Sequence, residues 1–176
     1  MPLSEFVEQK QTRGKLSKGS PVRLRYAITS DIRFIGRLSR DVFAIYGPYE
    51  DILSGWFKNE KGVSTVIACQ DNMQIGFAML NEPSERYDFQ DASELLGLAV
   101  EPERQGEGVG GLLLGAIDSI SESLNIKWVF LHTAVDNIPA QRLYKRNGYV
   151  PLEIKKNFYP EGQDASVMYK AVKRMY

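Results

Sequence analysis

Residues 92–124, ASELLGLAVEPERQGEGVGGLLLGAIDSISESL, decide the fold, and their pattern predicts a strand, a glycine-rich loop and a helix in that order. The loop glycines let the backbone pass close to a ligand and leave N–H groups free to bind it. They are Gly106, Gly108, Gly110 and Gly111. Apolar residues then recur at spacings of three and four, which is typical of a helix with one buried face. They are Val109, Leu112, Leu113, Ala116, Ile117, Ile120 and Leu124. A glycine loop before a helix N-terminus favours a pyrophosphate as ligand.

Two familiar nucleotide-binding loops fit this stretch less well. An ATP-binding P-loop requires Gly-Lys-Ser/Thr, which is missing here. Gly106, Gly108 and Gly111 match the dinucleotide pattern G-x-G-x-x-G, but the chain after Gly111 is too short for the second half of that fold. A third pattern, Q/R-x-x-G-x-G/A, runs from Gln105 to Gly110. A glycine-rich turn without a ligand stays as the alternative interpretation.

Composition predicts one soluble catalytic or binding domain. The chain has 176 residues, 43% of them hydrophobic, which is enough for one well-buried core. We expect a single domain over 21–176 and an N-terminal tail or extension over 1–20. The 22 basic and 22 acidic residues balance, so we expect neither nucleic acid nor a membrane as partner. One cysteine, Cys69, excludes an internal disulfide, and we see no export segment or spanning apolar run. A cytoplasmic monomer or homodimer is the expectation.

Hydrophobic periodicity and turn signals predict the remaining elements. Gly47-Pro48 separates two helices, and Asp71-Asn72-Met73 suits a hairpin turn. The expected helices cover 31–45, 49–58, 109–124 and 137–147, and the expected strands cover 22–28, 63–70, 74–81, 92–100, 126–134, 149–158 and 165–172. The order β-α-α-β-β-β-α-β-α-β-β predicts an α/β fold with helices flanking one mixed sheet.

Two motifs carry a resemblance to a known family. The first is Gln105-Gly106-Glu107-Gly108-Val109-Gly110, preceded by Leu98-Ala99-Val100-Glu101-Pro102. The second is Asn137-x-x-Ala140-x-x-Leu143-Tyr144-x-x-x-Gly148-Tyr149. Together they resemble the GCN5-related N-acetyltransferase (GNAT) superfamily, over roughly residues 21–172 and in the same order of elements. The resemblance implies an acetyl-coenzyme A-dependent enzyme with no metal ion.

The resemblance also implies which residues contact acetyl-coenzyme A. The backbone of Gln105, Gly106, Glu107, Gly108, Val109, Gly110 and Gly111 would hold the pyrophosphate. Leu98, Ala99 and Val100 would pair with the pantetheine arm, on a strand that splays from its neighbour in the family, and Asn137 would lie beside that arm. Tyr144 matches the tyrosine that donates a proton to the departing sulfur. An ordinary core tyrosine is the alternative for Tyr144.

The general base has two candidates. Glu94 lies where one branch of the family carries a catalytic glutamate, and His132 follows Leu131 as in one branch of the N-terminal acetyltransferases. An α-amine, with a pKa of roughly 8, needs less help from a base than a lysine does, so an ordered water bridged by both groups is a further alternative.

The acceptor is predicted from the C-terminal segment. Lys155-Lys156-Asn157-Phe158-Tyr159-Pro160, followed by Asp164-Ala165 and Met168, resembles protein N-terminal acetyltransferases. We expect Phe158 and Tyr159 to face the helix–break–helix, whose aromatic residues are Phe43, Tyr46 and Tyr49, across a narrow groove. The expected acceptor is the N-terminal α-amine of a protein or peptide. A lysine, a polyamine or another small amine, or a coenzyme A-binding module without activity, remain alternatives.

Overall fold

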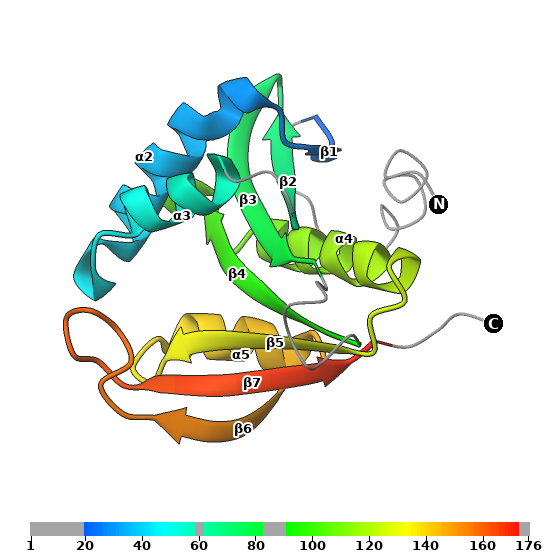
Figure 1. Cartoon of the computed structure of the whole chain (residues 1–176). Helices are drawn as coiled ribbons and strands as arrows, with labels where there is room; N and C mark the ends of the chain where they lie inside the picture. Colours follow the sequence, from blue (N-terminus) through cyan, green and yellow to red (C-terminus); the bar gives the residue numbers. More distant parts are fainter. Residues whose placement is uncertain (1–19, 59–61, 83–90, 173–176) are drawn as a thin grey trace.

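The computed structural model describes residues 20–58, 62–82 and 91–172, and they form one seven-stranded sheet with helices on both faces (Figure 1). The expected tail over 1–20 lies, except for Ser20, outside the described residues. The strands are β1 (Arg23–Tyr26), β2 (Val63–Gln70), β3 (Met73–Asn81), β4 (Ala92–Val100), β5 (Trp128–Ala134), β6 (Val150–Lys155) and β7 (Ala165–Ala171). The helices are α2 (Ile32–Phe43), α3 (Tyr49–Lys58), α4 (Val109–Ser123) and α5 (Ile138–Arg146). Short 3₁₀ turns are η1 (Thr29–Asp31), η2 (Ala44–Tyr46) and η3 (Pro102–Arg104).

The first four strands form an antiparallel meander whose turns follow the sequence signals. Asp71 and Asn72 both have positive φ, 49° and 63°, as a tight hairpin between β2 and β3 requires. The predicted order of helices and strands is confirmed. The spatial order, β1-β2-β3-β4-β5-β7-β6, adds that β7 lies between β5 and β6.

The parallel pair β4–β5 is joined over only part of its length. Pairing runs from Ala92 with Trp128 to Leu95 with Leu131. Beyond Leu95, β4 pairs with β3, and the rest of β5 pairs with β7. The two strands therefore part in the middle of the sheet, which leaves the β5-facing edge of residues 96–100 without a strand partner in the described structure.

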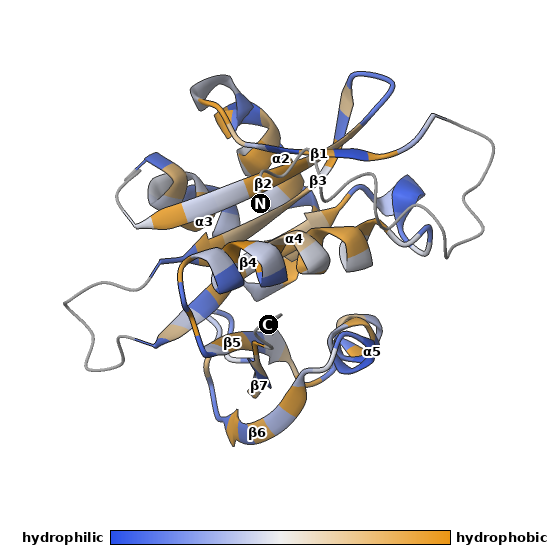
Figure 2. Cartoon of the chain, turned by 90° about the vertical axis from the view of Figure 1, so that its right-hand side faces the viewer, coloured by the Kyte–Doolittle hydropathy of each residue, from blue (hydrophilic) through white to orange (hydrophobic). Residues whose placement is uncertain are grey.

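A small cluster joins Ala134 and Ala165 to Tyr46 and Tyr159, and most other buried residues of the sheet pack into two large cores. One core joins the sheet to α4 and α5, and the other joins the opposite face to α2 and α3. Figure 2 shows hydrophobic residues along β3 and α4 between these layers. Among the described elements, no helix covers the face of β5, β7 and β6 that is turned to the viewer in Figure 1. No helix in the described part of the chain is both long and apolar enough to cross a bilayer.

Some details differ from the sequence pattern. The strand expected over 149–158 ends at Lys155, so Phe158 and Tyr159 lie in the loop that follows it. Ile45 was expected on the buried face of the first helix, but the helix ends at Phe43 and Ile45 lies 65% exposed in η2. Asp31 lies at the expected start of α2, yet its carboxylate does not cap that helix. It accepts two hydrogen bonds from Arg25, at 2.7 and 2.8 Å, and one from the backbone N–H of Ile28.

Candidate active site

The glycine loop presents an open backbone at the N-terminus of α4. Gly106 and Gly108 have φ of 80° and 89°, a region that favours glycine, and nothing lies within 4 Å of a Cβ placed on either. Gly108 is the N-cap of α4, so no side chain caps the first N–H groups of the helix. The Glu107 carboxylate bonds to Arg104 at 2.8 Å, which neutralises its charge. Free N–H donors at a positive helix end fit a pyrophosphate.

Gly110 differs from the other three loop glycines in what a side chain there would contact. A Cβ on Gly110 would come within 2.9 Å of Cδ2 of Leu143, whereas a Cβ on Gly111 would meet nothing within 4 Å. Gly110 therefore lets α4 approach α5, which carries Leu143 and Tyr144. This helix contact, rather than space for a phosphate, explains glycine at position 110.

The parted strand edge lies beside the loop. Leu98, Ala99 and Val100 occupy the end of β4 that has left β5. The Gln105 side chain donates a hydrogen bond of 3.1 Å to the carbonyl of Val100, which ties the glycine loop to that edge. An extended ligand arm that enters between β4 and β5 would find unused backbone groups here.

Glu94 and His132 form a direct pair. Glu94 is in register with Phe130, two residues before His132, so both side chains project from the same face of the sheet. His132 Nδ1 lies 2.7 Å from Glu94 Oε1. The Glu94 side chain is 41% exposed and that of His132 only 15%. The two candidate bases are thus partners, and Glu94 is the one that solvent reaches more freely.

Two further residues, which the sequence pattern did not single out as neighbours, complete the surroundings of His132. Lys155 Nζ lies 3.2 Å from Nε2 of His132. The Phe158 ring stacks on the imidazole with a centroid distance of 4.3 Å and an interplanar angle of 6°. Lys155 was visible in the sequence as part of a basic pair, but only the β6–β7 pairing brings it opposite β5.

Tyr144 lies in α5 with its ring buried. Burial raises the pKa of its phenol to about 12, so the hydroxyl stays protonated near neutral pH and can donate a proton. The neighbouring Tyr149 ring meets it edge-on at 5.8 Å. Asn137 caps α5, because its side-chain oxygen accepts a hydrogen bond of 3.2 Å from the N–H of Ala140.

The side on which the sequence predicts the acceptor has an aromatic wall built from two segments far apart in the sequence. We define this wall as Phe43, Tyr46, Tyr49, Phe158 and Tyr159. The Tyr159 ring lies 5.0 Å from that of Tyr46 and 6.1 Å from that of Tyr49, and Phe43 lies 5.6 Å from Tyr49. The first three residues come from the α2–η2–α3 segment, and the last two come from the loop between β6 and β7.

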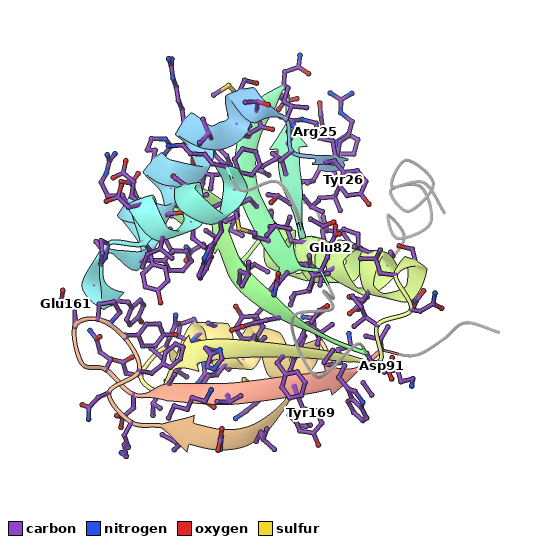
Figure 3. All side chains as sticks on the ribbon, viewed as in Figure 1. Arg25, Tyr26, Glu82, Asp91, Glu161 and Tyr169 are labelled. Carbon is purple, nitrogen blue, oxygen red and sulfur yellow. The ribbon has the colours of Figure 1, made fainter. Side chains whose placement is uncertain are left out.

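These two segments touch rather than stand apart. Gln163 donates a hydrogen bond to the carbonyl of Ile45, and Pro160 lies so close to Gly47 that a Cβ there would come within 2.8 Å. Figure 3 shows Glu161 in this loop, next to the junction of α2 and α3. The expected groove is therefore bounded at this end by a contact between its walls. Within the described ranges, no group of three or more His, Cys, Asp or Glu residues is placed to hold a metal ion.

Comparison with solved structures shows which class of enzyme this fold defines. The ribosomal-protein-S18-alanine N-acetyltransferase of Escherichia coli superimposes with a TM-score of 0.74 at 21% identity, covering 88% of this chain and 96% of that one. The spermidine N-acetyltransferase of Vibrio cholerae, solved with CoA and spermine, superimposes with a TM-score of 0.70 at 25% identity, covering 86% and 95%. The fold is that of the N-acetyltransferases.

The chain belongs to the Acetyltransferase (GNAT) family, whose sequence model matches residues 33–149. It is similar to the N-alpha-acetyltransferase of Saccharolobus solfataricus, with 27% identity over 161 residues that cover 86% of this chain and 93% of the relative. The chain is thus an N-acetyltransferase that uses acetyl-CoA as its acetyl donor, as its motifs predicted.

Proposed function

We propose that this enzyme acetylates the N-terminal α-amine of a protein or peptide. The observation that carries the proposal is the contact between the α2–α3 junction and the β6–β7 loop, where Tyr46 and Tyr159 pack at 5.0 Å. An internal lysine arrives on a chain that continues in both directions, which needs a groove open at both ends. A chain terminus needs only one open end.

The charges near the site support a peptide over a polyamine. The aromatic wall is uncharged, and the charged groups next to His132 are Glu94 and Lys155, which have opposite signs. A polycation such as spermidine would meet the Lys155 ammonium. The similarity to the spermidine enzyme of Vibrio cholerae keeps a polyamine as the second candidate acceptor.

Acetyl-CoA supplies the acetyl group as a thioester. We assign its pyrophosphate to the backbone of residues 105–111 and its pantetheine arm to the free edge at Leu98–Val100, close to Asn137. In the transfer, the amine nitrogen forms a bond to the acetyl carbon as the carbon–sulfur bond breaks. Glu94, directly or through a water, accepts the proton that the amine loses, and the Tyr144 hydroxyl donates a proton to the sulfur. Glu94 then releases its proton to solvent and the Tyr144 phenolate regains one from solvent, so the net products are an N-acetyl amine and a thiol.

One assay tests the acceptor. A peptide with a free N-terminus and no lysine is compared with the same peptide blocked at its N-terminus and carrying an internal lysine, and with spermidine. We expect the free-terminus peptide to have the highest kcat/KM. Faster acetylation of the blocked peptide or of spermidine would contradict the N-terminal proposal and leave the family membership standing.

A further inference from the structure

Both ring nitrogens of His132 have a charged partner. These partners restrict which of the two nitrogens can carry the proton of the neutral ring. Nδ1 faces the carboxylate of Glu94 at 2.7 Å, and Nε2 faces the Lys155 amine at 3.2 Å. An ionised carboxylate only accepts hydrogen bonds, and an ammonium only donates them. A neutral imidazole with its proton on Nδ1 is the form that satisfies both contacts at once.

We propose that Lys155 is a positioning residue that occupies Nε2 of His132, whose Nδ1–H is held by Glu94, and thereby leaves Glu94 to serve as the proton acceptor. The inference rests on the proposed function for the direction of proton transfer, but not for the tautomer. With Lys155 donating to Nε2, the imidazole has no free lone pair to take a proton from the amine. Glu94 keeps its second carboxylate oxygen, and its side chain is the more exposed of the pair.

Packing supports the same arrangement. Phe158 stacks flat on the imidazole, which fixes the plane in which both ring nitrogens point. Lys155 Nζ lies 5.8 Å from the centroid of the Phe158 ring, so the cation is held over the ring that supports the histidine. Lys155 pairs with Ala165 of β7, which in turn pairs with Ala134 of β5, so the sheet register brings the lysine to this face.

In the described structure, two other titratable groups near His132 do not supply a second cation. Glu153 lies on the same face of β6, in register with Val167, the cross-strand partner of His132. From α3, Tyr49 lies near enough to Glu94 to feel its charge. Both sit beside the Glu94–His132–Lys155 chain, in which Lys155 is the cation.

The chain contains a single histidine, which makes the tautomer directly measurable. In protein labelled with ¹⁵N-histidine, we expect the two ring nitrogens of His132 at neutral pH to show a proton bonded to Nδ1. Because Glu94 still accepts from Nδ1, Lys155→Met should keep the Nδ1–H form but shift the Nε2 resonance toward that of a lone pair without a donor, whereas Lys155→Arg, which keeps a donor, should leave that resonance in place. Lys127→Met is the control, because its surface pair with Asp91 is outside the site.

Kinetics supply the second readout. We expect Lys155→Met to lower kcat by about 10- to 100-fold, the cost of a misplaced catalytic group, with the KM for peptide changed less than kcat. Lys155→Arg should recover most of this loss, and Lys127→Met should match the parent enzyme. Thermal melting checks that each variant is folded.

An Nε2–H imidazole in the parent protein, or a Lys155→Met variant with an unchanged Nε2 resonance and unchanged kcat, would overturn the inference. These outcomes are separate from the fate of the proposed function. If the enzyme prefers spermidine, the acceptor proposal fails while the Nε2 resonance still decides the role of Lys155.

Discussion

The side-chain amide of Gln163 donates a hydrogen bond of 2.5 Å to the carbonyl oxygen of Ile45, 118 residues earlier in the chain. Through it the β6–β7 loop is tied to the turn between α2 and α3. The same two segments meet again where Tyr46 packs on Tyr159. An acceptor that approaches Glu94 past the aromatic wall therefore meets the contact between the β6–β7 loop and the α2–α3 turn.

Gln163→Leu keeps the approximate size of the side chain but removes its hydrogen-bond donor. We therefore expect the contact between the β6–β7 loop and the α2–α3 turn to weaken. The KM for a free-terminus peptide should rise several-fold, and the preference for it over a blocked, lysine-bearing peptide should narrow. Competition between the two peptides, quantified by mass spectrometry, measures this. The Lys127→Met variant serves as a control, and an unchanged preference in Gln163→Leu would mean that the hydrogen bond does not select the acceptor.

Tyr144→Phe should lower kcat by about 10²–10⁴-fold, because it removes a proton donor and keeps the ring. Affinity for CoA, measured by calorimetry, should stay close to that of the parent. Full activity across the pH range would assign the proton donor elsewhere.

Tyr144 also predicts a pH effect on stability. Burial raises its pKa to about 12, so its contribution is complete below the unfolded value of about 10 and is lost as pH rises through about 12. Tyr144→Phe should therefore flatten this part of the alkaline stability loss.

Gly108→Val and Gly110→Val should impair different properties of the enzyme, CoA binding in the first and thermal stability in the second. A side chain on Gly108 is strained by its φ of 89° and lies in the open loop, so we expect CoA affinity to fall more than stability does. A side chain on Gly110 meets Leu143, so we expect the melting temperature to fall, and Leu143→Ala in the same chain should restore part of it. Calorimetry with CoA and thermal melting separate the two effects. Equal CoA affinity for Gly108→Val and the parent would argue against the pyrophosphate assignment.

Asp31 predicts how the fold responds to acid. Burial raises the pKa of its carboxyl, but the hydrogen bonds from Arg25, Ile28 and Gln74 outweigh burial and leave the pKa below its usual value. A depressed folded pKa stabilises the fold above the unfolded value, about pH 4, and this contribution is lost as pH falls through the folded pKa. Asp31→Asn should lower the free energy of unfolding at pH 7 by about 1.5–3 kcal/mol and weaken its dependence on pH below about 4. Urea unfolding at pH 7 and pH 3 tests both parts, and equal losses at the two pH values would contradict the assignment.

The sequence predicted the order of elements well because strong local signals mark them. Gly47-Pro48, Asp71-Asn72 and Gly148 each end or turn an element through backbone geometry that depends on the residue itself. The end of the first helix was predicted too late in the sequence. The spacing of apolar residues continues to Ile45, although the backbone has already changed to the 3₁₀ turn η2.

The candidate site residues came from motifs and from the family resemblance, and their mutual contacts were only partly predictable. The glycine loop and Tyr144 belong to the two motifs, whereas Glu94 and His132 were proposed from the resemblance to two branches of the family. The contacts of Lys155 and Gln163 were not predictable, because they depend on β7 entering between β5 and β6, and that long-range pairing leaves no mark in the local sequence.

β4 and β5 pair over only four residues, from Ala92 to Leu95, and this short pairing has a kinetic consequence. α4, which follows the glycine loop, packs on one face of the sheet, whereas Phe43 and Tyr49 of the aromatic wall pack on the other. Where the two strands part, a donor that enters from the first face and an amine that enters from the second can meet while both are bound. The acetyl group then never needs to reside on the protein, so double-reciprocal plots of initial velocity at several donor concentrations should intersect instead of running parallel.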